Sequence, residues 1–143
     1  MRETTTMKFL TPLIVLGVLL VGKASAADVK IIANPSVTVS EISVADLKLI
    51  FLETKTSLGA AHVEPVLTEA GAAHAEFLAK YIGRTDEGLR IYYRSLMFTG
   101  KGSIPKSFPT TAAAVAYVSK TKGAIAYVEE SEATQGVKEI RVK

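Results

Sequence analysis

The sequence has no cysteine and no tryptophan, and its only histidines are His62 and His74. Without cysteine there are no disulfides and no thiol catalysis, and most structural zinc sites are excluded. No H-x-H or H-E-x-x-H spacing occurs, and neither histidine has an obvious catalytic triad. We therefore expect solvated or core-edge histidines, no metal site, no catalytic residues, no cofactor and no enzymatic activity.

Long hydrophobic runs are also scarce, and the longest one lies near the start of the chain. Arg2 and Lys8 precede a mostly apolar stretch of 13 residues from Phe9 to Val21, and Ala24-Ser25-Ala26 follows it. This is the pattern of a secretory signal peptide with cleavage before Ala27. The alternative is an uncleaved anchor, but spanning a bilayer takes roughly 20 residues. We expect residues 1–26 to be a signal peptide, with export to the periplasm and no stable membrane anchor after cleavage.

The remaining segment, residues 27–143, carries almost no net charge. The whole chain has a net charge of +3, but the signal region holds Arg2, Lys8, Lys23 and Glu3. What remains is 14 basic and 13 acidic residues, a net charge of +1. This balance implies neither nucleic acid nor an anionic membrane surface as a partner. Its 117 residues are enough for one domain with its own core.

Hydrophobic periodicity and capping residues predict an alternation of strands and helices. Pro65 predicts an edge or irregular position for the second strand, and Pro105 and Pro109 predict an irregular stretch before the last helix. The order β-α-β-α-α-α-β-β predicts an α/β domain with one mixed sheet. The predicted strands are 29–33, 63–67, 124–128 and 137–142, and the predicted helices are 43–52, 71–82, 85–99 and 110–119.

Three short segments are candidates for binding a charged ligand, each with a structural alternative. Thr99 to Ser103, T-G-K-G-S, offers backbone N–H groups, a hydroxyl and a lysine for an anion, or it is a helix C-cap with a flexible exit. Gly71 to His74 begins a helix after Thr68, and it is an anion site or plain helix initiation. The carboxylates Glu129, Glu130 and Glu132 form a cation site or a solvated loop.

Four segments together resemble a known family. Ser43 to Lys55 resembles a helix motif L-S-x-x-D-L-x-x-I-F-L-G-K, with Glu53 where glycine is usual, and Lys122 to Glu129 resembles P-G-A-I-G-Y-V-E. Val63 to Phe77 and Phe98 to Ser103 resemble the strand-to-helix segment and the glycine-rich loop of the same proteins. These are the substrate-binding proteins of phosphate ABC transporters, in particular small exported members with one lobe. The resemblance implies an α/β fold for residues 27–143: a single lobe of a type II periplasmic binding protein, with a mixed sheet flanked by helices.

The departures from the family pattern bear on the ligand. Full-length phosphate binders follow the second strand with an arginine and a G-S-G-T turn, which hold the oxyanion by charge-assisted hydrogen bonds. Leu67 and Thr68 lie where the arginine is expected, and Ala72, Ala73 and His74 lie where S-G-T is expected. Two-lobed binding proteins also close on their ligand by a hinge, whereas one lobe presents half a cleft.

Two functions follow from this resemblance. The first is an exported solute-binding-like protein that binds phosphate or a related oxyanion weakly. The remaining ligand-binding candidates would be Thr68, Gly71, Ala72 and His74, together with Lys101, Gly102 and Ser103. The second is a non-transport interaction module in the periplasm that keeps the lobe but has lost the phosphate site. Its partner would be an envelope protein or an ABC transporter component.

Overall fold

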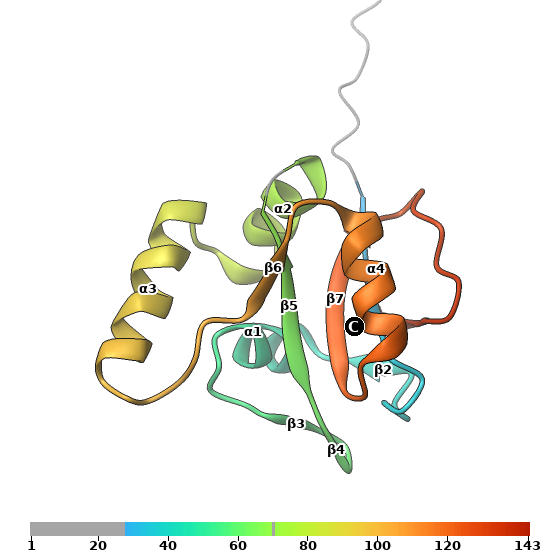
Figure 1. Ribbon diagram of the computed structural model, residues 1–143, viewed down its shortest axis with the longest axis horizontal. Coiled ribbons are helices and arrows are strands. Elements are labelled where there is room, and N and C mark those ends of the chain that lie inside the picture. Colours follow the sequence, from blue (N-terminus) through green and yellow to red (C-terminus); the bar gives the residue numbers. More distant parts are fainter. Residues whose placement is uncertain (1–27, 70) are drawn as a thin grey trace, which may run out of the picture.

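The computed structural model describes residues 28–69 and 71–143, so the signal-peptide prediction for residues 1–26 lies outside this part of the chain. Its centre is a six-stranded mixed sheet in the order β2-β8-β1-β7-β5-β6 (Figure 1). The strands are β1 (Val29–Ala33), β2 (Glu41–Ile42), β5 (Glu64–Thr68), β6 (Lys106–Phe108), β7 (Ala124–Glu129) and β8 (Lys138–Val142). A separate short hairpin joins β3 (Ser57–Leu58) to β4 (Ala61–His62).

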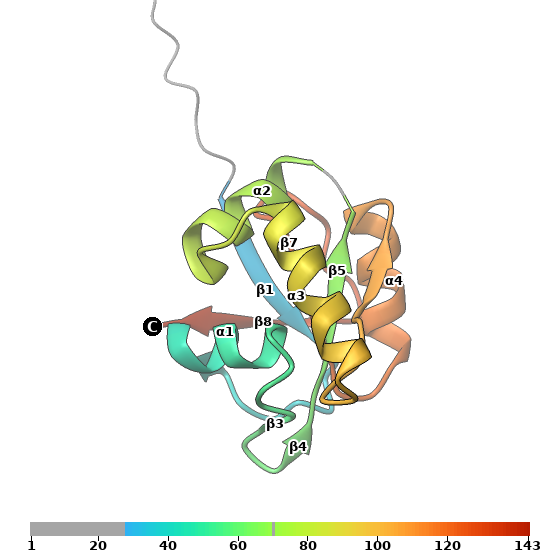
Figure 2. The same ribbon diagram turned by 90° about the vertical axis from the view of Figure 1, so that its left-hand side faces the viewer.

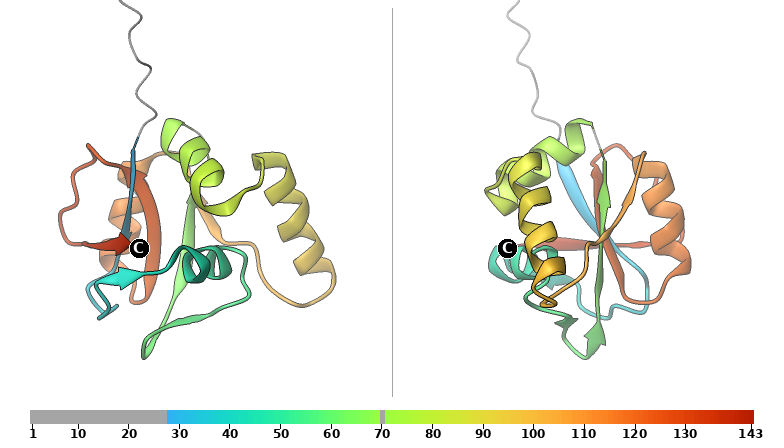
Figure 3. Two further views of the ribbon diagram at one scale, coloured as in Figure 1. Left: turned by 180° about the vertical axis from the view of Figure 1, so that it is seen from behind. Right: turned by 60° about the vertical axis from the view of Figure 1, so that its left-hand side comes forward.

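Helices cover both faces of the sheet. They are α1 (Val44–Phe51), α2 (Ala72–Phe77), a π-helical turn η1 (Leu78–Ile82), α3 (Asp86–Phe98) and α4 (Thr111–Lys120). Figures 2 and 3 show α1, α2 and α3 on one side of the sheet and α4 on the other. This confirms the predicted fold class, a mixed sheet flanked by helices.

Strand β7 divides the core into two layers. Ile125 and Tyr127 pack with Phe51 and Phe77 under α1 and α2, whereas Ala126 packs on the opposite face with the residues under α4. Every residue from Ala124 to Val128 is buried, as expected for a strand covered on both faces. The strand predicted at 124–128 is therefore the centre of the fold.

Three of the four predicted helix starts are confirmed by side-chain caps, and the helix after Gly71 has none among the described residues. The side-chain oxygens of Ser43, Thr85 and Thr110 each accept a hydrogen bond of 3.1 Å from the backbone N–H three residues later. Such caps satisfy amide groups that have no partner within the helix. Gly83 ends the second predicted helix in the left-handed conformation, with φ of 71°, but the last turn before it is π-helical rather than α-helical.

The prediction that Pro65 marks an edge or irregular strand is wrong for β5 as a whole. Strand β5 lies inside the sheet, parallel to β7 on one side and to β6 on the other. The N–H of Glu64 faces β7, where it donates to the Gly123 carbonyl at 2.8 Å, so the backbone N of the next residue faces β6. Because β6 pairs only from Val66 onward, the missing N–H of Pro65 leaves no gap in the ladder.

A further prediction, about the region after α3, is also wrong. The stretch between Pro105 and Pro109 is not irregular, because it contains β6. This strand lies at the sheet edge and pairs on one side only, which leaves room for proline at each end. Within α3, Met97 is 51% exposed, whereas Leu89 and Tyr93 are buried. Within residues 28–69 and 71–143, no helix has the length and apolar character needed to cross a membrane.

Candidate functional site

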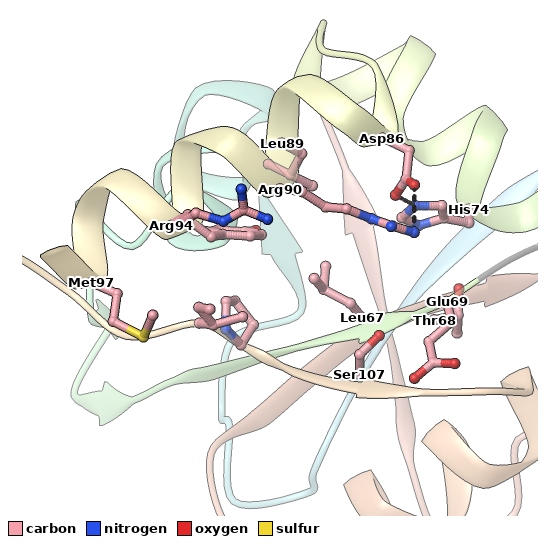
Figure 4. Close-up of a pocket in the computed structure, with 13 residues that line it drawn as sticks. Leu67, Thr68, Glu69, His74, Asp86, Leu89, Arg90, Arg94, Met97 and Ser107 are labelled. Carbon is pink, nitrogen blue, oxygen red and sulfur yellow. Dashed lines mark hydrogen bonds and ion pairs between the residues drawn. The ribbon is translucent and has the colours of Figure 1, made fainter.

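A pocket of about 450 Å³ lies between α3, the carboxyl end of β5, and β6 with the segment that leads into it (Figure 4). The chain leaves β5 over one face of the sheet through α2 and α3, and it leaves β6 over the other face through α4. Ligands of open α/β sheets bind outside the carboxyl ends of strands at such a change of direction. The pocket is lined by Leu67, Thr68, Glu69, His74, Asp86, Leu89, Arg90, Tyr93, Arg94, Met97, Ile104, Pro105 and Ser107.

Thr68, the last residue of β5, contributes the most unusual polar group of this pocket. Its side chain is buried, and its hydroxyl oxygen has no hydrogen-bond partner in the described part of the chain. The Thr68 N–H donates to the Tyr127 hydroxyl at 3.1 Å, and its carbonyl lies 3.4 Å from the same oxygen. A buried hydroxyl without a partner is unfavourable, so it marks a place where a ligand atom would be stabilising.

His74 connects this strand end to α3. Its Nδ1 lies 2.5 Å from the Tyr127 hydroxyl, and its Nε2 lies 2.8 Å from Asp86 Oδ1. With the proton on Nε2, the ring donates to the carboxylate and accepts from the tyrosine O–H, which satisfies all three groups. Burial raises the pKa of Tyr127 to about 12, so its hydroxyl keeps its proton at neutral pH.

Two of the charged side chains that line the pocket, Asp86 and Arg90, form an ion pair, and two others, Arg94 and Glu69, do not within the residues described. Asp86 accepts a hydrogen bond from His74, and its charge is balanced by Arg90, whose Nη2 lies 2.9 Å from Asp86 Oδ2 one helical turn away. Arg94 and Glu69 make no ion pair with any residue in the described ranges. Figure 4 shows the arginines of α3 across the pocket from Ser107 and the end of β5. Arg94 is therefore the basic group most available to an anion.

The predicted site residues are divided between different parts of the molecule. Thr68 and His74 both line the pocket. Gly71 precedes α2 and lines a shallower neighbouring hollow with His74, and Ala72 is exposed as the first residue of α2. His62 is exposed, and His74 is buried at the edge of the core with a partner at each ring nitrogen, as expected for solvated or core-edge histidines.

Lys101, Gly102 and Ser103 follow the far end of α3 and do not line this pocket. The N–H groups of Gly100 and Lys101 donate to the carbonyls of Met97 and Leu96, at 3.2 and 3.0 Å. With Gly100 at φ of 67°, this geometry is a helix C-cap, and it occupies two of the amides proposed for an anion.

The carboxylate run after β7 has structural partners. Glu132 accepts a hydrogen bond of 2.7 Å from the Thr111 hydroxyl, and its backbone carbonyl accepts one from Lys30 at 2.9 Å. No group of three or more potential metal-binding side chains occurs among the described residues.

Sequence reasoning missed Asp86, Arg90, Arg94, Ser107 and Tyr127 as site residues. The spacing of Asp86, Arg90 and Arg94 at i, i+4 and i+8 was visible and places them on one helix face. Tyr127 gave no such signal, because an aromatic residue in a buried strand is usually part of the core.

Comparisons with known proteins agree on the fold. No protein-family model matches the sequence, and no curated protein matches it significantly. Among solved structures, an ABC-type phosphate transport receptor from Vibrio cholerae is similar, with a TM-score of 0.62 and 15% identity over 80% of this chain and 45% of that chain. A protein from Clostridium perfringens, assigned as a phosphate ABC transporter substrate-binding protein and solved with bound phosphate, has a TM-score of 0.59 and 18% identity over 80% and 44%.

A candidate phosphate-binding protein from Planctomyces limnophilus is also similar, with a TM-score of 0.54 and 15% identity over 80% and 41% of the two chains. The chain thus spans less than half the length of these structures. At this level of identity the likeness shows the fold alone. The resemblance based on sequence motifs is confirmed in that sense: the chain has the fold of part of a phosphate ABC transporter binding protein, consistent with a single lobe.

Proposed function

We propose that this protein is an exported, periplasmic, solute-binding-like protein that binds phosphate or a related oxyanion weakly in the pocket beside α3. The observation that supports this most is the unpartnered, buried Thr68 hydroxyl at the end of β5. It lies on a pocket to which Arg94 contributes a positive charge without an ion-pair partner among the described residues. The similar fold of proteins named for phosphate binding adds to this support.

Binding would rest on the residues that the pocket brings together. The Arg94 guanidinium would donate charge-assisted hydrogen bonds to the oxyanion, and the hydroxyls of Thr68 and Ser107 would donate neutral ones. Arg90 already bonds Asp86, so it would serve mainly to cancel that carboxylate. His74 would hold Asp86 and Tyr127 in place rather than contact the anion.

Two features keep the expected affinity low. A single lobe cannot enclose a ligand by hinge closure, so the bound anion stays partly in water, where charge interactions are weak. Glu69 also lines the pocket and repels an anion. We therefore expect a dissociation constant of about 1 mM, equivalent to about −4 kcal/mol.

Isothermal titration of the purified full-length protein with phosphate at constant ionic strength tests this function. We expect saturable binding that Arg94→Gln weakens at least about tenfold, which is about 1.4 kcal/mol. Lys120→Gln is the matched control, because it removes the same charge from α4 on the opposite face of the sheet. No binding at several millimolar phosphate, or equal weakening by both substitutions, would contradict the proposal.

A second candidate function is a periplasmic interaction module for an envelope protein or a transporter component. The observation that favours it is the exposed apolar side chains of α3, where Phe98 at the end of the helix is 80% exposed and Ile91 in its middle is 58% exposed. Crosslinking in the envelope fraction tests it. A specific partner should be lost with Phe98→Ser and kept with Leu49→Ser, an exposed apolar position on α1. Equal crosslinking of both variants would argue against it.

A further inference from the structure

The pocket beside α3 is larger than a small inorganic anion requires. Its volume of about 450 Å³ falls in the range of roughly 300–1,000 Å³ typical of pockets for small organic ligands. An inorganic phosphate held by Arg94 and Thr68 would fill only a fraction of this space. The remaining volume lies against protein atoms that a phosphate ion would leave in contact with water.

The lining is divided into a polar end and an apolar end. Figure 4 shows Thr68, Glu69, His74 and Asp86 gathered at one end and Met97 at the other. Leu67 lies between them, and Arg94 projects from α3 above the middle of the pocket. The other apolar side chains that line the pocket are Leu89, Tyr93, Ile104 and Pro105.

The apolar end has side chains that a ligand could cover. Met97 and Ile104 are 51% and 49% exposed, although both border a concave surface rather than an isolated position. Covering apolar surface is favourable in proportion to its area, and methionine adapts its shape to different ligands. An inorganic anion has no apolar group, so contact with Met97 and Ile104 would not add to its binding free energy.

We infer that the pocket takes an organic phosphate, in which a phosphoryl group carries an apolar body of about the size of a benzene ring. The phosphoryl group lies between Arg94, above the middle of the pocket, and the Thr68 hydroxyl at the polar end, and both groups donate to it. The apolar body lies against Met97 and Ile104. This inference rests on the proposed oxyanion-binding function and names the class of ligand that the same pocket prefers.

Comparing the affinities of the full-length protein for phosphates of different size, each measured in a separate titration, tests this inference. The ligands are phenyl phosphate, methyl phosphate and inorganic phosphate, with phenol as the uncharged control. We expect phenyl phosphate to bind at least about tenfold more tightly than methyl phosphate or inorganic phosphate, and phenol to show no saturable binding. Met97→Ser should remove the preference for phenyl phosphate over inorganic phosphate.

The matched control for Met97→Ser is Ile91→Ser, an exposed apolar position on the same helix that does not line this pocket. It should leave the preference for phenyl phosphate intact. Equal affinities for phenyl and inorganic phosphate would overturn this inference while leaving the proposed function standing. Binding of phenol as tight as that of phenyl phosphate would also overturn it, because the phosphoryl group would then contribute nothing. If none of the three phosphates binds, both this inference and the proposed function are overturned.

Discussion

Glu53 has a left-handed backbone conformation, which is unfavourable for a residue with a side chain. It adopts φ of 61°, and no other described residue besides glycine has a positive φ. The family motif that this segment resembles has glycine at the same position, and left-handed backbone explains that preference. Its carboxyl is half-buried, and burial, followed by repulsion from Glu64, raises its pKa. Glu53 is thus unfavourable in two independent ways.

Glu53→Gly and Glu53→Gln separate these two effects. Because the folded-state pKa is raised, the protonated carboxyl favours folding at low pH, and this contribution is lost as the pH rises through the folded-state pKa. We expect Glu53→Gln to stabilise the protein more at pH 7 than at pH 4. Glu53→Gly also removes the carboxyl, so it should stabilise the protein by about 0.5–1 kcal/mol more than Glu53→Gln at both pH values, because it relieves the backbone as well. Chemical denaturation at the two pH values measures both, and destabilisation by glycine would contradict this account.

Tyr127 has a hydroxyl that two buried groups depend on. Tyr127→Phe leaves the Thr68 N–H and the His74 Nδ1 without their partner. We expect a loss of about 1–3 kcal/mol in the free energy of unfolding, because buried polar groups would be left unsatisfied. Tyr117→Phe is the control, since its hydroxyl bonds the part-buried Glu64 carboxylate and water can replace it. Urea denaturation should show the larger loss for Tyr127, and equal losses would contradict this role.

Replacing Glu69 tests whether its negative charge weakens anion binding in the pocket. Glu69→Gln removes a negative charge from the lining, and Glu130→Gln removes one from an exposed position beyond β7. We expect only the first to strengthen phosphate binding, by about two- to fivefold, which is the size of an exposed charge interaction. Titration calorimetry at low salt measures this change, and no difference between the two variants would place the anion elsewhere.

At the scale of elements, the turn from α4 into β7 depends on glycine for steric reasons. Gly123 has φ of 78°, and a Cβ atom there would lie 2.2 Å from the His62 carbonyl oxygen. Its own carbonyl accepts from Glu64 at 2.8 Å, at the point where β5 begins to pair with β7. A side chain at this position would therefore separate β5 from β7.

Gly123→Ala would introduce both backbone strain and a steric clash, whereas Gly100→Ala would introduce backbone strain alone. Both glycines have positive φ, but a Cβ atom at Gly100 would meet nothing within 4 Å. We expect Gly100→Ala to cost about 1–2 kcal/mol from the backbone, and Gly123→Ala to cost distinctly more or to prevent folding. Thermal unfolding measures both, and similar losses would show that the close approach is unimportant.

Most elements could be predicted from sequence because their signals are local. The caps at Ser43 and Thr85 and the glycine ends at Gly83 and Gly123 each depend on a few adjacent residues. The wrong predictions concern Pro65 and the stretch from Pro105 to Pro109, where the position of a strand in the sheet decides whether proline is tolerated. Pro65 is accommodated because β6 begins one residue later, and such a pairing register has no local signal.

At the scale of the whole molecule, the candidate site is made by contacts between distant parts of the chain. Thr68 and His74 could be proposed from sequence, but the Tyr127 hydroxyl that joins them is 59 and 53 positions away. Arg94 could be assigned to a helix, but not to this pocket, because its position depends on how α3 packs. The chain corresponds to less than half of each similar structure, so any closure around a ligand would require a second molecule or domain.

An amide-resolved NMR titration of the full-length protein with phosphate, against chloride at the same ionic strength, tests the central claim most directly. The account predicts saturable shifts at Thr68 and Ser107 and at the Arg94 side chain, all with one dissociation constant of about 1 mM. Small shifts that do not saturate, or shifts confined to Lys101, Gly102 and Ser103, would contradict it.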